Sequence, residues 1–162
     1  MIHGQYLDEI RARWEAVRDI AIEIADGPGG HASVLARDGA GRSELCVMRD
    51  GDRASDGDVL FIGHAVSDVP RLLAALESGS LLSAEDAAVI GMRIASASPG
   101  PWTAFIESDG GIGGSDVIRV SGSDSEADMY LWMGPDLAPS AIFRFVAEAR
   151  QDLPALVAAA RQ

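Results

Sequence analysis

Residues 145–157 read FVAEARQDLPALV, and this closing stretch decides how the rest of the chain is interpreted. Eighty-four positions earlier, residues 61–73 read FIGHAVSDVPRLL. Phenylalanine, alanine, aspartate and proline coincide in register, and the neighbouring apolar positions remain apolar. The correspondence predicts two divergent copies of one unit, residues 1–80 and residues 81–162, which together form one compact globular body.

Both copies are predicted to begin with a helix that gives way to a strand. In the first copy an apolar stripe at helical spacing covers residues 7–17, and an alternating strand pattern follows at residues 20–24. In the second copy residues 83–86 resemble a capping box that opens the helix. The SPGP sequence at residues 98–101 ends that helix before a strand over residues 102–107, because proline restricts the residue before it to extended geometry.

Two further strands follow in each copy, joined by short polar turns that suit antiparallel hairpins. In each closing segment an aspartate, Asp68 or Asp152, stands two residues before a proline, which predicts an N-cap and the start of a new helix. The predicted unit is therefore α-β-β-β-α-α, and the predicted fold is α+β, with antiparallel meander sheets and helices packed on one face. The sequence leaves open whether the halves share one sheet or form two layers. The further strands are expected at residues 31–37, 44–49, 116–121 and 128–133.

Composition narrows the range of functions. The chain has 162 residues, enough to bury a core without covalent staples, and its formal net charge of −12 is shared by both halves. Phosphate backbones and anionic membranes repel such a surface, so neither nucleic acid nor a membrane is the expected partner. The first residues have no signal-peptide pattern, and no apolar run approaches the roughly 20 residues of a membrane span, so the expected location is the cytoplasm.

Motifs that could carry chemistry are incomplete. The glycine-rich loop at residues 110–114 precedes a predicted strand, so no helix N-terminus is available there for a phosphate. The acidic run at residues 50–58 fits a calcium loop in neither register and is expected to be a solvated loop that caps the next helix. The lone Cys46 is expected to be a small buried hydrophobe, and the three histidines lack metal-ligand spacing. No catalytic, cofactor-binding or metal-binding residue is assigned.

The most informative stretch is the predicted strand at residues 129–133, which reads MYLWM. Because side chains alternate along a strand, Tyr130 and Trp132 share one face and the methionines and leucine share the other. On the preceding strand, Arg119 joins the face of the two aromatic residues. Two amphipathic rings beside an arginine are typical of the centre of a protein interface, so Arg119, Tyr130 and Trp132 are the candidate partner-binding residues. The alternative is that helices cover both faces of the sheet.

Two segments of the second copy carry a resemblance. SPGPW at residues 98–102, followed by Phe145, Ala149-Arg150, Asp152, Pro154 and Leu156, resembles small proteins of actinobacterial genomes, bacteriophages and prophages, including early-region proteins of lambdoid phages. Those proteins carry (T/S)PGPW and end in a pattern like FIAxARxDxPxLL. The resemblance spans roughly residues 87–162. It implies a mobile-element or accessory setting and brings no activity, cofactor or catalytic residue with it.

These features favour a non-enzymatic, acidic accessory protein that binds a protein partner. An immunity or inhibitor role suits this charge, because a negative surface is steered towards a basic target such as a nuclease toxin. One alternative is an enzyme that binds a small molecule or a metal between the two halves. A second alternative is a structural homo-oligomer, in which the aromatic face is a homodimer contact.

Overall fold

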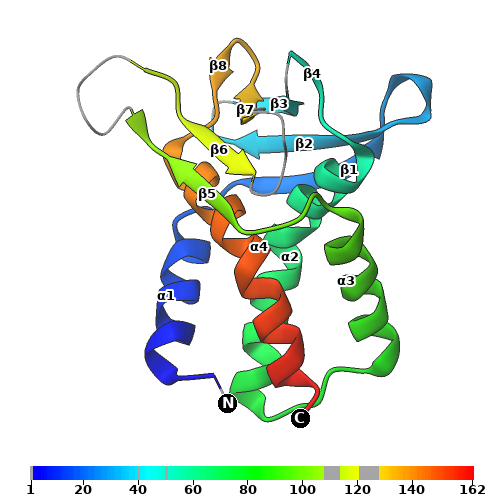
Figure 1. Cartoon of the computed structure of the whole chain (residues 1–162), viewed down its shortest axis with the longest axis vertical. Helices are drawn as coiled ribbons and strands as arrows, with labels where there is room; N and C mark the ends of the chain where they lie inside the picture. Colours follow the sequence, from blue (N-terminus) through cyan, green and yellow to red (C-terminus); the bar gives the residue numbers. More distant parts are fainter. Residues whose placement is uncertain (1, 40, 50, 108–113, 121–127) are drawn as a thin grey trace.

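A single antiparallel sheet carries the helices on one of its faces, as Figure 1 shows. This computed structural model describes residues 2–39, 41–49, 51–107, 114–120 and 128–162. Within those residues, four α-helices and eight strands form the α+β architecture predicted from the sequence, which is thereby confirmed. The two ends of the chain lie together at the far end of the helical layer from the sheet.

The elements alternate in the same order in each half. The helices are α1 (Gly4–Glu15), α2 (Asp56–Ser78), α3 (Ala84–Ser96) and α4 (Ser140–Ala160), with a short 3₁₀ turn η1 (Pro28–Gly30). The strands of the first half are β1 (Ala21–Asp26), β2 (Ala32–Asp38), β3 (Gly41–Arg49) and β4 (Asp52–Arg53). Those of the second half are β5 (Trp102–Phe105), β6 (Val117–Val120), β7 (Met129–Met133) and β8 (Asp136–Leu137).

The two halves share one sheet, which answers the question that the sequence left open. The strand order is β1-β2-β3-β7-β6-β5, with the short β4 paired to β3 and the short β8 paired to β7. The halves meet where β3 runs antiparallel to β7, with Val47 opposite Leu131 and Cys46 opposite Trp132. This pairing places the last full strand of each half at the centre of the sheet.

The core lies between the sheet and the two long helices α2 and α4, which run side by side down the middle of the helical layer in Figure 1. Phe61 in α2 and Phe145 in α4 are both buried. Gly63 lets α2 approach the sheet closely, because a Cβ there would lie only 2.9 Å from the Val34 side chain and 3.0 Å from that of Ile24. Helices α1 and α3 flank the central pair on opposite sides.

The predicted break in each closing helix is wrong. Both α2 and α4 continue through their prolines, Pro70 and Pro154. Proline removes the hydrogen bond that residue 70 would donate to the carbonyl of Val66. The Trp14 indole Nε1 from α1 donates to that carbonyl instead, at 3.3 Å. A donor from another helix therefore offsets part of the cost of the interruption, which local sequence cannot reveal.

Equivalent positions of the two halves occupy equivalent elements. Phe61 and Pro70 lie in α2, and Phe145 and Pro154 lie in α4, the last helix of each half. Asp68 and Asp152, which were expected to cap new helices, are instead buried inside α2 and α4. This arrangement is the one that the duplication hypothesis requires, while the common origin of the halves stays a prediction.

Helix α2 has a further property that bears on the membrane prediction. It is 23 residues long and, by length and composition alone, is apolar enough to cross a bilayer. Half of its most apolar 18-residue window is buried inside the protein, where Phe61, Ile62 and Leu72 belong to the core. A central core helix of a packed domain has this composition, because it is surrounded by other elements on most sides.

Candidate functional site

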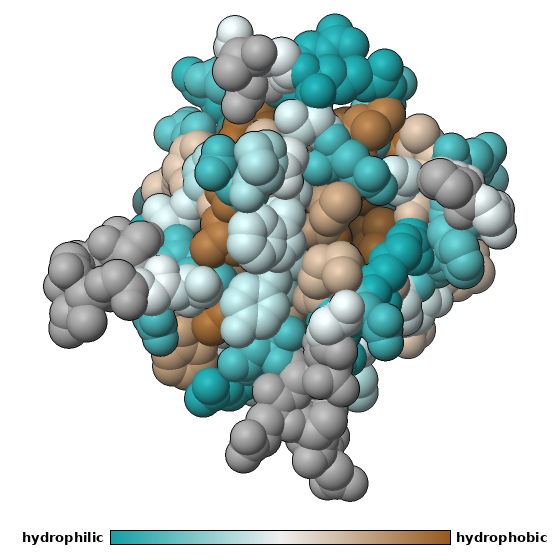
Figure 2. Space-filling model, turned by 90° about the horizontal axis from the view of Figure 1, so that it is seen from above, coloured by the Kyte–Doolittle hydropathy of each residue, from teal (hydrophilic) through white to brown (hydrophobic). Residues whose placement is uncertain are grey.

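The candidate functional site is the face of the sheet that points away from the helices, which we call the outer face. Alternation along β7 buries Met129 and Leu131 under the helices and places Tyr130 and Trp132 on the outer face, where they are partly exposed. The two sets of side chains therefore separate as predicted. Figure 2 views the molecule from this side, and brown and pale side chains occupy much of its middle.

The centre of the outer face is formed by both halves of the chain. In the pairing of β3 with β7, Met48 lies opposite Tyr130 and Cys46 lies opposite Trp132. All four side chains are partly exposed, and we call this group the central strip. Two aromatic rings, a thioether and a thiol combine apolar area with polar handles, the composition found at the middle of protein interfaces.

Arg119, the third candidate residue, lies on the same face but is engaged locally. Its guanidinium lies 4.7 Å from the centre of the Phe105 ring, a cation–π contact. Its Nε and Nη2 donate to the two carboxylate oxygens of Asp128, at 3.2 and 3.4 Å. The side chain remains 61% exposed. Sequence reasoning placed Arg119 on the correct face and did not reveal its contacts with Phe105 and Asp128.

Sequence reasoning missed three contributors to the outer face, namely Cys46, Met48 and Phe105. Cys46 was expected to be buried and is instead half-buried on the outer face, where burial and the neighbouring Glu44 raise the pKa of its thiol. The apolar run at residues 45–48 gives no periodic signal that distinguishes its two faces. Phe105 is 41% exposed. Its neighbours Ala104 and Ile106 are also apolar, so the sequence pattern does not show which face of the strand Phe105 occupies.

A pocket of about 310 Å³ opens on the outer face beside the central strip. It lies where β5, β6 and β7 meet, and its walls combine rings with carboxylates. We call it the aromatic–acidic pocket, and its lining includes Phe105, Glu107, Val117, Arg119, Asp128 and Tyr130. The predicted glycine-rich turn at residues 110–114 is adjacent in the chain and, apart from Gly114, lies outside the described residues.

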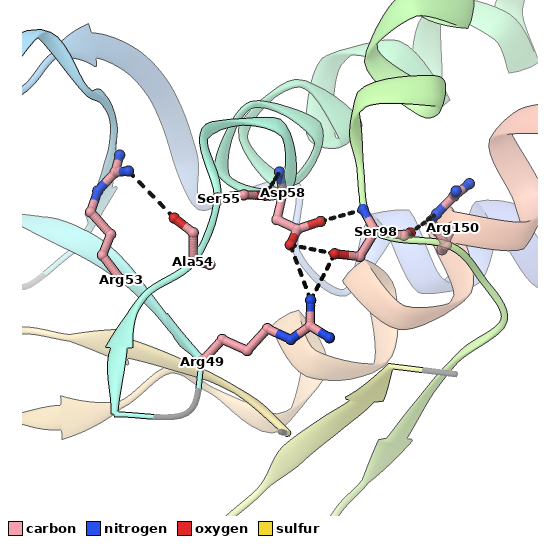
Figure 3. Close-up of polar contacts among 7 residues, drawn as sticks. All are labelled: Arg49, Arg53, Ala54, Ser55, Asp58, Ser98 and Arg150. Atoms are coloured by element: carbon pink, nitrogen blue, oxygen red, sulfur yellow. Dashed lines mark hydrogen bonds and ion pairs between the residues drawn. The ribbon is translucent and has the colours of Figure 1, made fainter. Parts of the chain in front are cut away.

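A second polar group is buried at the junction of the halves, as Figure 3 shows. Asp58, in the first turn of α2, is 0% exposed. Its carboxylate accepts from the Ser98 backbone N–H at 2.6 Å and from the Ser98 hydroxyl at 2.8 Å. Arg49 Nη1 donates to the same hydroxyl at 2.8 Å and lies 3.9 Å from the Asp58 carboxylate. We call Arg49, Asp58 and Ser98 the junction cluster.

The junction cluster corrects the expectation for the acidic run. Asp58 was expected to lie in a solvated loop, yet it is buried because α2 packs directly against the end of α3. Gly57 makes this approach possible, since a Cβ there would lie 1.9 Å from the Ser96 carbonyl oxygen. The capping role expected of the run is filled by Ser55, whose hydroxyl accepts from the Asp58 N–H at 3.2 Å.

The two segments that carried the sequence resemblance meet in space. Arg150 Nε, in α4, donates to the Ser98 carbonyl at 3.0 Å, as Figure 3 shows, and burial lowers the pKa of this guanidinium. The amide of Gln151 accepts from the Trp102 N–H at 3.0 Å and donates to the Trp102 carbonyl at 3.1 Å. The Trp102 ring packs edge-on against Phe61, with centroids 5.3 Å apart. These residues join α4 to the segment between α3 and β5 and to Trp102, the first residue of β5, which is a structural role.

The described ranges offer little for metal or nucleophilic chemistry. Among the residues that the structure describes, no three His, Cys, Asp or Glu side chains gather closely enough to hold a metal ion. The Ser98 hydroxyl donates to the Asp58 carboxylate and accepts from Arg49, so it links two residues of the fold. Comparison of the chain with family models, with curated proteins and with solved structures finds no match.

Proposed function

We propose that this chain is a non-enzymatic accessory protein that binds a basic protein through the outer face of its sheet. The observation that carries the proposal is the position of Tyr130 and Trp132, partly exposed at the centre of a sheet face that the four helices leave open. Large exposed rings in a contiguous apolar strip risk association with other molecules, and a protein retains such a strip where it serves recognition. Tyrosine and tryptophan are also enriched among residues that dominate binding energy.

Charge supports the choice of partner. The chain carries a net charge of −12. Exposed carboxylates stand on the strands of the central strip and on the short strands paired to them: Glu44 on β3, Asp52 on β4 and Asp136 on β8. A surface of this sign accelerates encounter with a basic protein and disfavours acidic ones. An inhibitor or immunity protein of the cytoplasm, directed against a basic toxin such as a nuclease, fits both the charge and the open face.

A homodimer and an enzyme are the two alternatives to this proposal. A second copy of the chain could cover the central strip and form a homodimer, although two acidic surfaces repel each other at low salt. An enzyme that binds a small molecule between the halves would need polar groups exposed at that junction. The junction cluster supplies polar groups at this place, and they bind one another within the fold.

The test compares two double variants. Tyr130→Ala with Trp132→Ala removes the rings of the central strip, whereas Leu81→Ala with Met92→Ala removes exposed apolar side chains from the helical side. Surface plasmon resonance against purified products of neighbouring genes measures binding, and light scattering measures self-association. The first variant should lose about 2–4 kcal/mol of binding energy and the second should bind normally. Equal binding by the wild type and by the variant that lacks both rings would contradict the proposal.

A further inference from the structure

We infer that the aromatic–acidic pocket receives an arginine side chain of the protein partner. The inference rests on the proposed function and deepens it, because it names the chemistry that selects a basic target. The outer face supplies a partner with apolar area at the central strip. The pocket, beside that strip, is the feature that discriminates by charge.

The lining of the pocket has the composition that recognises a guanidinium. Glu107 and Asp128 carry two negative charges and Arg119 carries one positive charge, so the described lining has a net charge of −1. The rings of Phe105 and Tyr130 belong to the same pocket. A planar cation stacks on an aromatic face and donates to carboxylates at the same time, and arginine does this better than lysine because its donors form a flat fork.

Arg119 demonstrates this mode of binding within the chain. Its guanidinium lies over Phe105 and donates to both oxygens of Asp128. Glu107 remains as the second carboxylate, is exposed, and has no hydrogen-bond or ion-pair partner among the described residues. An arginine of the partner could therefore pair with the Glu107 carboxylate and stack on the Tyr130 ring. The contacts of Arg119 with Phe105 and Asp128 would remain in place.

An anion is disfavoured in the same pocket. Arg119 is the cation of the described lining, and it is already paired with Asp128. The carboxylate of Glu107 would repel an anion that entered the pocket. A volume of about 310 Å³ is at the lower end of small-molecule sites and suits one side chain better than a large ligand. The pocket therefore selects a positive side chain.

The test uses blocked tripeptides and the full-length protein. Acetyl-Gly-Arg-Gly-amide is titrated into ¹⁵N-labelled protein at constant ionic strength, to about 100 mM, because one exposed cation–π contact and one ion pair together contribute only about 1.5–2 kcal/mol, a Kd of tens of millimolar. The same peptide with citrulline, which lacks the charge, is the control ligand. We expect the arginine peptide to shift the amides of Val117, Arg119 and Tyr130 and the citrulline peptide to leave them in place.

A pair of charge-matched variants locates the effect. Glu107→Gln should weaken binding of the arginine peptide about two- to fivefold, the range of one exposed ion pair. Glu15→Gln removes the same charge from α1, on the helical side, and should leave the affinity unchanged. Equal shifts with citrulline, no shifts at these three amides, or equal weakening by both variants would each overturn the inference. None of these results affects the protein-binding role of Tyr130 and Trp132, which the partner experiment tests separately.

Discussion

Arg93 and Asp68 form a fork in which one guanidinium nitrogen of Arg93, Nη1, lies 2.9 and 2.8 Å from the two carboxylate oxygens of Asp68. The pair joins α3 of the second half to α2 of the first half. A matching contact runs the other way, from Arg13 in α1 to Asp152 in α4, at 2.8 Å. Each half therefore supplies the arginine that neutralises the buried aspartate in the closing helix of the other half.

Breaking the fork should destabilise the protein. Asp68→Asn leaves Arg93 beside a neutral amide in a partly buried site. Removing one partner of a fully buried pair costs about 3–5 kcal/mol, and the partial exposure of Arg93 reduces the expected loss to about 2–3 kcal/mol. Urea denaturation measures the change. Asp8→Asn, which disrupts an exposed pair with Arg11, is the control and should cost less than about 1 kcal/mol. Equal losses would show that the fork has no special role.

Asp152 also accepts a hydrogen bond from Tyr6 of the other half, and this contact makes the stability of the protein depend on pH. Burial and a 2.5 Å hydrogen bond to Asp152 raise the pKa of Tyr6, because both favour the neutral phenol. A group with a raised folded pKa contributes stability that is fully present below its unfolded pKa, about 10, and is lost as pH rises towards the folded value. We expect the free energy of unfolding to fall with pH above about 10.

Two conservative variants test this assignment. Tyr6→Phe removes the phenolic proton and should flatten the decrease in unfolding free energy above pH about 10. Tyr130→Phe, which retains Tyr6 and Asp152, is the matched control, because the chain has two tyrosines. Denaturation at several alkaline pH values supplies the slopes. A wild-type slope in Tyr6→Phe would contradict the role of the Tyr6–Asp152 contact.

The junction cluster should be more sensitive than nearby surface serines. Ser98→Ala removes the hydroxyl that links Arg49 to Asp58, and we expect a loss of about 1–3 kcal/mol because the buried Asp58 carboxylate loses a donor. Ser96→Ala, two residues earlier, removes only a hydroxyl that donates to the Met92 carbonyl at an exposed site and should be nearly neutral. Thermal unfolding compares the two. A smaller effect at Ser98 than at Ser96 would exclude a structural role for the cluster.

The contact of Trp14 with α2 has a testable coupling to Pro70. Trp14→Phe removes the donor to the Val66 carbonyl and should cost about 1–2 kcal/mol. In a Pro70→Ala background, residue 70 regains an N–H that can donate to the same carbonyl. The cost of Trp14→Phe should therefore be smaller in that background, and a double-mutant cycle measures the difference. Strictly additive costs would mean that Trp14 does not replace the missing helical donor.

The sequence was most informative where a pattern is local. Alternation at residues 129–133 correctly separated the buried Met129 and Leu131 from the outer Tyr130 and Trp132, and the Ser83 cap was recognised from four residues. It failed at Pro70 and Asp68, because a proline after an aspartate is typical of a helix start. The compensating contacts, from Trp14 to the Val66 carbonyl and from Arg93 to Asp68, come from helices distant in the sequence.

The candidate site shows the same limit. Periodicity identified which residues share a face, but it could not say which strands become neighbours. The pairing of β3 with β7 joins Cys46 and Met48 to Tyr130 and Trp132, and that contact links residues more than eighty positions apart. The aromatic–acidic pocket likewise requires three strands to meet, so neither Phe105 nor Glu107 could be assigned to it from the sequence.

The central claim is that β7 has one face that builds the core and one face that is free to bind. Urea denaturation of two variants on this strand tests it most directly. Leu131→Ala, on the inner face, should cost about 2–5 kcal/mol, as expected for a fully buried leucine. Tyr130→Ala with Trp132→Ala should remain cooperatively folded and lose no more than about 2 kcal/mol, because both rings are already partly exposed. If the outer-face variant unfolds, or is destabilised as much as Leu131→Ala, the outer face is part of the core and the proposed binding role is wrong.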